Sequence, residues 1–457
     1  MEDTIAAVAT AYGEGGIGII RISGEEALPI LQEIFEFHGD TDTFTSRRMT
    51  YGKIIDKEKN QIIDEVLAVY MKGPKTYTAE DVVEINCHGS MVSLRKTLAL
   101  VLRKGARLAE PGEFTKRAFL NGRLDLSQAE AVIDMIRAKT DKSFDVAVSQ
   151  LEGRLSLKVE EIRQKLLDLL VDITVNIDYP DEDIEEMTYE KLEESIVETQ
   201  DMIEKLLATS STGKMIREGI KIAIVGKPNV GKSSLMNGLL KETRAIVTDI
   251  PGTTRDTIEE VLSIRNIPVY LVDTAGIRET SDKVEKMGIE KSKEAFNQAD
   301  FILFLLDGSR PLEEEDLQIM ELLKERKSLV LINKRDLGEA ISIEEIAAKL
   351  PASQVIEASL LKGQGIAEIE DAVEDLVYGG EIVQKESMMV NNVRHIELLQ
   401  QAVNSLTDAL HMSEGREALD FIEVDVKNAY ERLGEIIGET VSDDIINEVF
   451  ARFCLGK

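Results

Sequence analysis

Residues 226 to 233, Gly-Lys-Pro-Asn-Val-Gly-Lys-Ser, form a complete phosphate-binding loop motif. They follow an apolar segment, Ile222 to Val225, that predicts a strand, and they precede a segment that predicts a helix from about Ser234. Glycine is needed at 226 and 231 because backbone N–H groups must approach phosphate oxygens closely. Lys232 neutralises phosphate charge, and the Ser233 hydroxyl ligates Mg²⁺. The motif therefore predicts a nucleoside triphosphate site with contacts from Asn229, Val230, Gly231, Lys232, Ser233 and Ser234.

A second motif predicts which base the bound nucleotide carries. Asn333-Lys334-Arg335-Asp336 follows the strand predicted over Ser328 to Ile332. The carboxylate of Asp336 can accept hydrogen bonds from the N1–H and the exocyclic amine of guanine, whereas adenine offers no such donor pair. The tetrad thus predicts guanine specificity through Asn333, Lys334 and Asp336, and Ser359 in the segment 355–360 is predicted to pack against the base.

Two further segments complete the predicted nucleotide site. Asp273-Thr-Ala-Gly276 follows the apolar segment Val269 to Val272 and supplies a carboxylate on the magnesium side and a glycine N–H for the γ-phosphate. Residues 248–256 predict a mobile switch loop in which Thr254 is the second hydroxyl ligand of Mg²⁺, although an ordinary surface loop would have a similar composition. The predicted contacts here are Thr248, Asp249, Ile250, Pro251, Gly252, Thr253, Thr254, Asp273, Thr274, Ala275 and Gly276.

The position after Gly276 is Ile277, and an aliphatic side chain cannot orient an attacking water. Assistance to hydrolysis must then come from a carboxylate, a cation or a partner surface, and the polar run 278–285 offers candidates.

Composition limits the class of protein. A chain of 457 residues is long enough for about three domains. The formal net charge of -31 argues against a general nucleic-acid surface, so any nucleic acid must bind a local patch or come with a basic partner. Two cysteines without metal-ligand spacing, Cys87 and Cys454, predict a reducing compartment. No stretch approaches the roughly 18 apolar residues of a membrane span, and we expect a cytoplasmic protein.

The patterns predict a multidomain fold that combines α/β and all-α parts. Residues 1–119 mix short β-rich runs with turns and a helix, which predicts an α/β domain. Apolar residues three or four apart over 155–177 predict a long amphipathic helix, and a second follows over 189–207. The expected domains are 1–119, a helical part 120–215, a Ras-like P-loop domain 216–379, and a second helical part 380–457, so that one helical domain is interrupted by the nucleotide domain.

The chain ends with Phe453-Cys-Leu-Gly-Lys457 after a helix predicted over 443–453. A thiol, a flexible glycine and a terminal lysine could place reactive groups at an interface, and a frayed terminus is the alternative.

Over its whole length the sequence resembles the MnmE (TrmE) family of tRNA-modification GTPases. The resemblance rests on the phosphate loop with its second serine, the switch segment 252–256, the segment 273–277 and the Cys454-Leu-Gly-Lys457 ending. Related ribosome-assembly GTPases share the nucleotide motifs, but the segments Gly18-Ile-Ile-Arg-Ile-Ser-Gly24 and Pro111-Gly-Glu-Phe-Thr-Lys-Arg-Ala-Phe119 separate this chain from them.

The resemblance implies an N-terminal domain similar to folate-dependent one-carbon enzymes, which forms a homodimer and binds a formyl-tetrahydrofolate. The positions that match the family's folate site are Arg21, Glu84, Arg123 and Lys457, and Arg123 stands where some members have lysine. Cys454 is, by the same resemblance, the tail thiol that takes part in the modification chemistry.

The resemblance also implies that two G domains pair across a bound K⁺, which replaces the missing glutamine. Asn229 is the expected side-chain ligand, with backbone oxygens of Thr248 and Ile250 and an oxygen of Thr253 completing the site. Glu285 matches the carboxylate that polarises the attacking water.

The implied function is a potassium-dependent GTP hydrolase that acts with an MnmG-like flavoprotein, which carries FAD, in a heterotetramer. Together they would add a (carboxymethyl)aminomethyl group at C5 of the wobble uridine of certain tRNAs. The alternative is a regulatory GTPase switch in ribosome assembly without modification activity.

Overall fold

The computed structural model describes residues 3–11, 13–39, 42–178, 188–242, 260–272, 299–324, 326, 328–379, 389–454 and 456–457. The chain forms two compact units. The first comprises Met1–Ile133, Gln150–Leu167 and Tyr430–Lys457, and the second comprises Asp134–Ser149 and Asp168–Ala429. The division falls within four helices: α4 (Leu126–Arg137), α5 (Asp141–Leu151), α6 (Arg154–Asp178) and α15 (Leu419–Ile437).

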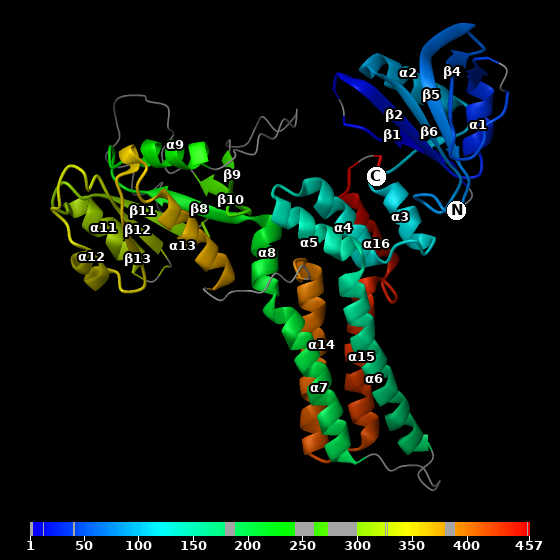
Figure 1. The fold of residues 1–457 in the computed structure, drawn as a ribbon. Helices are drawn as coiled ribbons and strands as arrows, with labels where there is room; N and C mark the ends of the chain where they lie inside the picture. The colour runs from blue at the N-terminus through cyan, green and yellow to red at the C-terminus, as the bar shows by residue number, and fades with distance from the viewer. Residues whose placement is uncertain are drawn as a thin grey trace. The chain divides into compact units, whose positions relative to one another are not determined.

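A seven-stranded sheet organises the first unit, with the strand order β3-β4-β5-β6-β2-β1-β7 (Figure 1, blue). Its strands are β1 (Ile5–Val8), β2 (Gly15–Ser23), β3 (Phe35–Phe37), β4 (Met49–Asp56), β5 (Gln61–Met71), β6 (Val82–Gly89) and β7 (Arg107–Leu108). Neighbours are antiparallel except β1 and β7, which are parallel. Alternate side chains point to one face, as Val83, Ile85 and Cys87 do in β6, and pack in one core with α1 (Ala27–Ile34) and α2 (Met91–Arg103).

A second cluster of the first unit joins residues 119–133 to the C-terminal residues 441–453. Helices α3 (Glu113–Leu120), α4 and α16 (Asp443–Ala451) bring together Phe119, Leu126, Phe450 and Phe453. At Gly438, where φ is 92°, a Cβ atom would lie 2.7 Å from the Phe119 ring, so the close approach requires glycine there.

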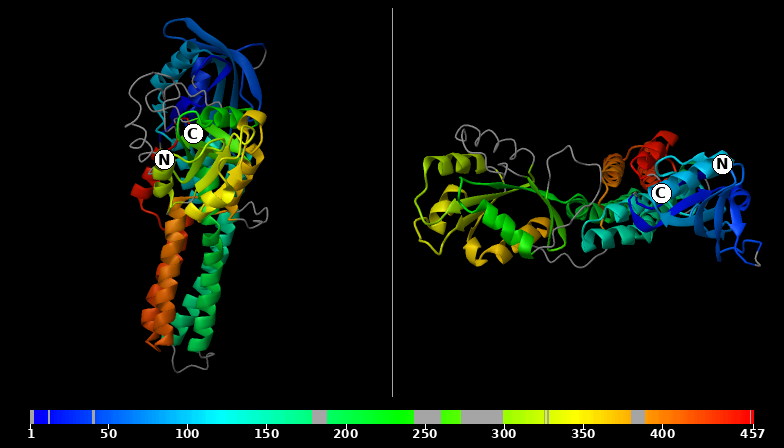
Figure 2. Two further views of the ribbon diagram at one scale, coloured as in Figure 1. Left: turned by 90° about the vertical axis from the view of Figure 1, so that its left-hand side faces the viewer. Right: turned by 90° about the horizontal axis from the view of Figure 1, so that it is seen from above.

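Long helices form part of the second unit. The predicted helices over 155–177 and 189–207 are confirmed as α6 and α7 (Tyr189–Ala208). Helix α7 packs along α14 (Val393–Glu414), and the two lie side by side in Figures 1 and 2. Their facing positions, among them Leu192, Ile196, Leu399 and Leu406, are fully buried, so the apolar stripes serve packing.

A six-stranded sheet forms the rest of the second unit, in the order β13-β12-β11-β8-β10-β9. The strands are β8 (Ile220–Val225), β9 (Glu260–Ile264), β10 (Ile267–Val272), β11 (Phe301–Asp307), β12 (Ser328–Asn333) and β13 (Gln354–Glu357). All neighbours are parallel except β9 and β10. The strand order reverses around β8, and ligands of open α/β sheets bind beyond the carboxyl ends of strands at such a point.

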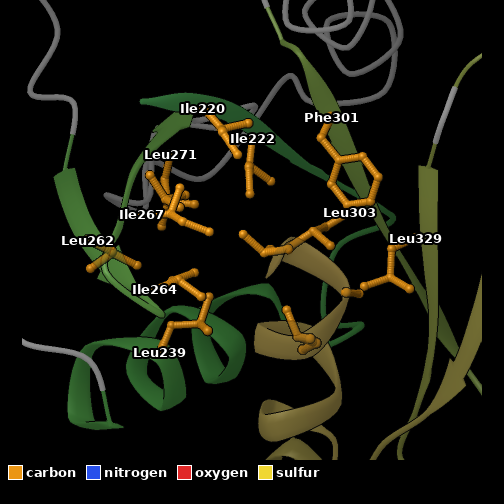
Figure 3. Packing of buried hydrophobic residues seen from close by; sticks show 14 of the residues in the cluster. Ile220, Ile222, Leu239, Leu262, Ile264, Ile267, Leu271, Phe301, Leu303 and Leu329 are labelled. Carbon is orange, nitrogen blue, oxygen red and sulfur yellow. The ribbon is translucent and has the colours of Figure 1, made fainter. Parts of the chain in front are cut away.

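Helices cover both faces of this sheet, as parallel strands require (Figures 1 and 2). On one face, α9 (Lys232–Glu242) and α13 (Ile366–Tyr378) bury residues such as Ile222, Leu239, Leu303 and Leu329, shown in Figure 3. On the other, α11 (Glu314–Leu323) and α12 (Ile343–Lys349) bury a separate cluster that includes Phe304. A 3₁₀ turn, Leu360–Lys362, follows β13.

The predicted combination of α/β and all-α parts is confirmed. Residues 210–214, at the end of the predicted helical part 120–215, begin a further helix, α8 (Ser210–Glu218). The close packing requires glycine at position 213 inside this helix, because a Cβ atom there would lie 2.3 Å from the Val390 carbonyl oxygen. No helix of the described residues is both long and apolar enough to cross a membrane.

Candidate functional site

The phosphate-loop motif connects β8 to α9, which begins at Lys232 rather than at the expected Ser234. Gly226 and Gly231 have φ values of 147° and 114°. A Cβ atom at Gly231 would lie 2.2 Å from the Asn333 amide nitrogen, so both the conformation and the space require glycine. The Lys232 ammonium spans the loop and donates to the Gly226 carbonyl oxygen at 2.7 Å.

The hydroxyl groups expected at Mg²⁺ and phosphate lie at the start of α9. Ser233 is exposed and Ser234 is half-buried, whereas Val230 is fully buried and anchors the loop in the core. A helix N-terminus carries free backbone N–H groups and a positive dipole end, which favour phosphate. An exposed serine hydroxyl in this place fits the ligand chemistry of Mg²⁺, which accepts oxygen donors.

Asn333 joins the phosphate loop to the predicted guanine-binding segment. Its buried amide donates to the Val230 carbonyl at 2.8 Å and accepts from the Leu360 N–H at 3.0 Å. Asn333 therefore links two loops from distant parts of the sequence at the carboxyl edge of the sheet. Sequence reasoning had placed Asn333 in the site without this role.

The next residue, Lys334, has a left-handed backbone with φ of 63°. Its ammonium group donates to the Asp307 carboxylate at 2.8 Å. Burial tends to raise the pKa of Asp307, but the hydrogen bonds from Lys334 and Ser309 outweigh it and hold the pKa below its ordinary value. Asp307 was missed in the sequence, where the strand-end position before Gly308 was its only signal.

Asp336 is oriented by Ser359, whose hydroxyl donates to the carboxylate at 2.8 Å. This hydrogen bond lowers the pKa of Asp336, so the group is an anion at neutral pH. Ser359 is buried, and it accordingly positions the carboxylate as well as lying where the base was expected. An ionised, oriented acceptor pair suits the two donors on the edge of guanine.

The structure therefore brings together the described members of the predicted GTP site, Asn229 to Ser234, Asn333, Lys334, Asp336 and Ser359. The remaining predicted residues lie outside the described part of the chain: Thr248, Asp249, Ile250, Pro251, Gly252, Thr253, Thr254, Asp273, Thr274, Ala275, Gly276 and Glu285.

The residues expected at folate lie in the first unit and also converge. Arg21 on β2 pairs with Glu84 on β6 at 2.8 Å, directly across the strand register. The Arg21 guanidinium lies 5.4 Å from the centre of the Tyr77 ring, and Arg123 lies 4.8 Å from the same ring. Arg123 also donates to the Tyr77 carbonyl at 2.8 Å. Tyr77, which sequence reasoning missed, thus holds both arginines.

The C-terminal tail is fastened beside this cluster. The Phe114 N–H donates to the Lys457 carbonyl at 3.2 Å, and Phe114 also faces Arg21 at 5.7 Å. Gly456 has φ of 88°, and a Cβ atom there would lie 2.1 Å from the Val8 carbonyl oxygen. The tail is therefore not a frayed end, and the thiol of Cys454 is exposed.

Comparison with known proteins identifies the family. Residues 126–454 match the family described as MnmE helical domain, and residues 4–123 match the GTP-binding protein TrmE N-terminus. The chain belongs to the MnmE family. It is 55% identical to the tRNA modification GTPase MnmE of Alkaliphilus metalliredigens and 54% identical to that of Clostridioides difficile, in both cases over 100% of each chain. Its family is thus one of GTP-hydrolysing enzymes of tRNA modification.

Among solved structures, the chain is similar to the G domain of FeoB from Methanococcus jannaschii. The two are 25% identical, and the match covers 35% of this chain and 98% of that one with a TM-score of 0.26. A score this low says nothing about the arrangement of the whole chain.

Proposed function

We propose that this chain hydrolyses GTP in a K⁺-dependent reaction and acts with an MnmG-like flavoprotein to add a (carboxymethyl)aminomethyl group at C5 of the wobble uridine of certain tRNAs in the cytoplasm. The observation that carries the nucleotide part is the junction of Asn333, Asp336 and Ser359 with the phosphate loop. Family membership supports the tRNA part.

The phosphate loop binds GTP through its backbone N–H groups, through Lys232 and through the hydroxyl groups that begin α9. Asp336, ionised and held by Ser359, selects guanine because its two oxygens meet two donors. Mg²⁺ would be held by Ser233 and Thr254 and would neutralise charge on the transferred phosphoryl group.

Asn229 is the proposed side-chain ligand of K⁺. It has a left-handed backbone with φ of 64°, it is exposed, and its amide makes no hydrogen bond with any residue that the structure describes. An amide oxygen that is free beside the phosphate loop can face a cation there. Thr248, Ile250 and Thr253 would supply the other oxygens, and Glu285 would orient the water that Ile277 cannot.

The cluster around Tyr77 is the proposed site of a formyl-tetrahydrofolate, the one-carbon donor. Glu84, oriented by Arg21, can accept from the donors of a pterin ring, and Arg123 and Lys457 can pair with the glutamate carboxylates of folate. Cys454 lies on the tail that closes this cluster and is the proposed reactive thiol. A homodimer of this chain would bind two copies of the partner, which supplies FAD.

The test of K⁺ dependence compares GTP hydrolysis in matched potassium and sodium buffers. Asn229→Ala should remove the potassium stimulation. The matched control is Asn266→Ala, because Asn266 has the same φ of 64° but lies in the turn between β9 and β10, at the opposite end of the sheet from the phosphate loop. Equal rates in both buffers, or equal losses in both variants, would remove the cation mechanism and favour a switch activated by a partner.

The modification itself is tested in cells. Transfer RNA from cells that lack the protein should lose the wobble modification, and the wild-type chain should restore it. Normal wobble modification in cells that lack the protein would contradict the proposed role in tRNA modification.

A further inference from the structure

Two neighbouring loops of the first unit carry a group of exposed cations. Arg47 and Arg48 precede β4, and Lys72 and Lys75 follow β5. All four side chains are exposed, and none forms an ion pair with a carboxylate of the described residues. The group therefore stands out in a chain whose net charge is -31. We call these four residues the basic patch.

Backbone hydrogen bonds hold the two loops together. The Arg47 N–H donates to the Tyr70 carbonyl at 2.7 Å, and the Lys72 N–H donates to the Ser46 hydroxyl at 3.0 Å. The Arg47 guanidinium also donates to the Lys75 carbonyl. The patch is consequently arranged before any ligand arrives, so a ligand need not order it.

The side chain of Asp81 holds the loop that follows β5. Asp81 accepts from the Gly73 N–H at 2.8 Å and from the Tyr70 hydroxyl at 2.7 Å. Both oxygens of this nearby carboxylate are thus engaged with the fold, and neither is paired with a cation of the patch. Asp81 therefore supports the loop without forming an ion pair with the patch.

Arg47 differs from the other cationic residues that have a left-handed backbone. Four cationic residues of the described chain have a left-handed backbone, a conformation that costs a residue with a Cβ atom about 1 kcal/mol. Arg265, Lys334 and Arg416 each pair there with a carboxylate of the protein. Arg47, with φ of 63°, pairs with none that the structure describes. The charge of its guanidinium, which donates to the neutral Lys75 carbonyl, is therefore not offset by a described carboxylate.

We propose that the basic patch binds the phosphate backbone of tRNA. The inference rests on the proposed function, since tRNA is the substrate that function names. Cations on one preformed surface neutralise successive phosphates and release their counterions, which gives affinity and orientation without reading bases. The patch would hold the body of the tRNA while the wobble base is modified elsewhere, and it supplies the local basic surface that an acidic chain requires.

The experiment uses the full-length chain and an unmodified tRNA transcript with a fluorescent label. Binding is measured by anisotropy over a series of KCl concentrations. The test variant is Arg48→Gln, Lys72→Gln, Lys75→Gln, which leaves Arg47 and its loop contacts intact. The matched control is Arg95→Gln, Lys57→Gln, Lys96→Gln, which removes one arginine and two lysines that are exposed on the same unit and form no ion pair with a described carboxylate.

The test variant should bind tRNA at least tenfold more weakly at physiological salt, and the slope of log K against log salt should fall by about 2 to 3. The control should stay near wild type. Equal binding by both variants, or no tRNA binding by the wild-type chain, would overturn the proposal. Vesicles that contain phosphatidylglycerol form a further arm, and loss of vesicle binding with unchanged tRNA binding would assign the patch to a lipid surface instead.

Basal GTP hydrolysis and wobble modification separate this inference from the proposed function. A chain that hydrolyses GTP and restores modification, but binds tRNA equally well in both variants, overturns the patch alone. A chain that supports neither activity overturns the proposed function, whatever the anisotropy shows.

Discussion

Replacing Asn333 by alanine tests whether the phosphate loop and the guanine segment act as one structure. The change removes the hydrogen bonds to Val230 and from Leu360 and leaves a buried carbonyl and a buried N–H without those partners. Each unpaired group costs about 1 to 3 kcal/mol, so the total for the two groups is roughly 2 to 6 kcal/mol. If the phosphate loop relaxes and admits water when no nucleotide is bound, the unpaired groups are hydrated in the free protein. Part of the free-energy cost then appears as weaker GTP binding rather than as lower stability of the fold.

The prediction therefore concerns the sum of two measured losses. Hydrogen exchange of the β8 and β12 amides gives the loss in local opening free energy, and titration with a fluorescent guanine nucleotide gives the loss in affinity. Their sum should reach about 2 to 6 kcal/mol, which corresponds to roughly 30-fold or more if it falls on affinity alone. The control Asn392→Ala removes the N-cap of α14, costs about 1 kcal/mol and should leave nucleotide affinity unchanged. A sum below about 1 kcal/mol would refute the linkage.

Three other substitutions test separate parts of the chain. Asp336→Asn should weaken GTP binding and favour xanthosine triphosphate, because the new amide donates where guanine also donates; competition binding measures this. Gly456→Ala should release the tail and weaken folate binding in calorimetry while GTP hydrolysis is unchanged, and Gly39→Ala, with φ of 90° and nothing within 4 Å of its Cβ position, controls for backbone strain. Burial and the hydrogen bond to Asp81 raise the pKa of Tyr70 to about 12 in the folded chain. The neutral phenol therefore contributes fully to the free energy of unfolding below pH 10, and this contribution is lost as the pH rises towards 12. Tyr70→Phe should remove that alkaline transition from an unfolding titration, and an unchanged transition would contradict the assignment.

The described part of the candidate nucleotide site could be placed from the sequence because short runs of adjacent residues form it. Residues 226–233 and 333–336 each follow a buried strand, so the parallel sheet alone brings their motifs to one edge. The linkage through Asn333 was not predictable, since segment 355–360 was predicted only to pack against the base and nothing in its sequence indicates that the Leu360 N–H donates to Asn333. Asp307 was also missed, because its sequence neighbourhood contains no nucleotide motif and its contact with Lys334 forms only in the folded chain.

The cluster around Tyr77 could not be derived from sequence pattern. Arg21 and Arg123 are separated by about a hundred residues, and the tail comes from the other end of the chain. Only tertiary packing brings them to one ring, so the resemblance to a family was needed to name them. In helix α8, Gly213 lowers the local helix propensity, and only the folded structure shows that the close approach of the Val390 carbonyl requires a glycine there.

The two cysteines differ in a way that bears on the modification chemistry. Burial raises the pKa of the Cys87 thiol to about 11, so at neutral pH it is almost entirely protonated and enclosed in the core of the first sheet. The thiolate is the reactive form, which leaves Cys87 inert. Cys454 is exposed, and its carbonyl lies 3.4 Å from the Gly112 N–H, so the backbone is held while the side chain is accessible. A thiol reagent that labels this chain without unfolding it therefore reacts at Cys454, on a segment whose position beside Phe114 is set by main-chain contacts rather than by the thiol itself.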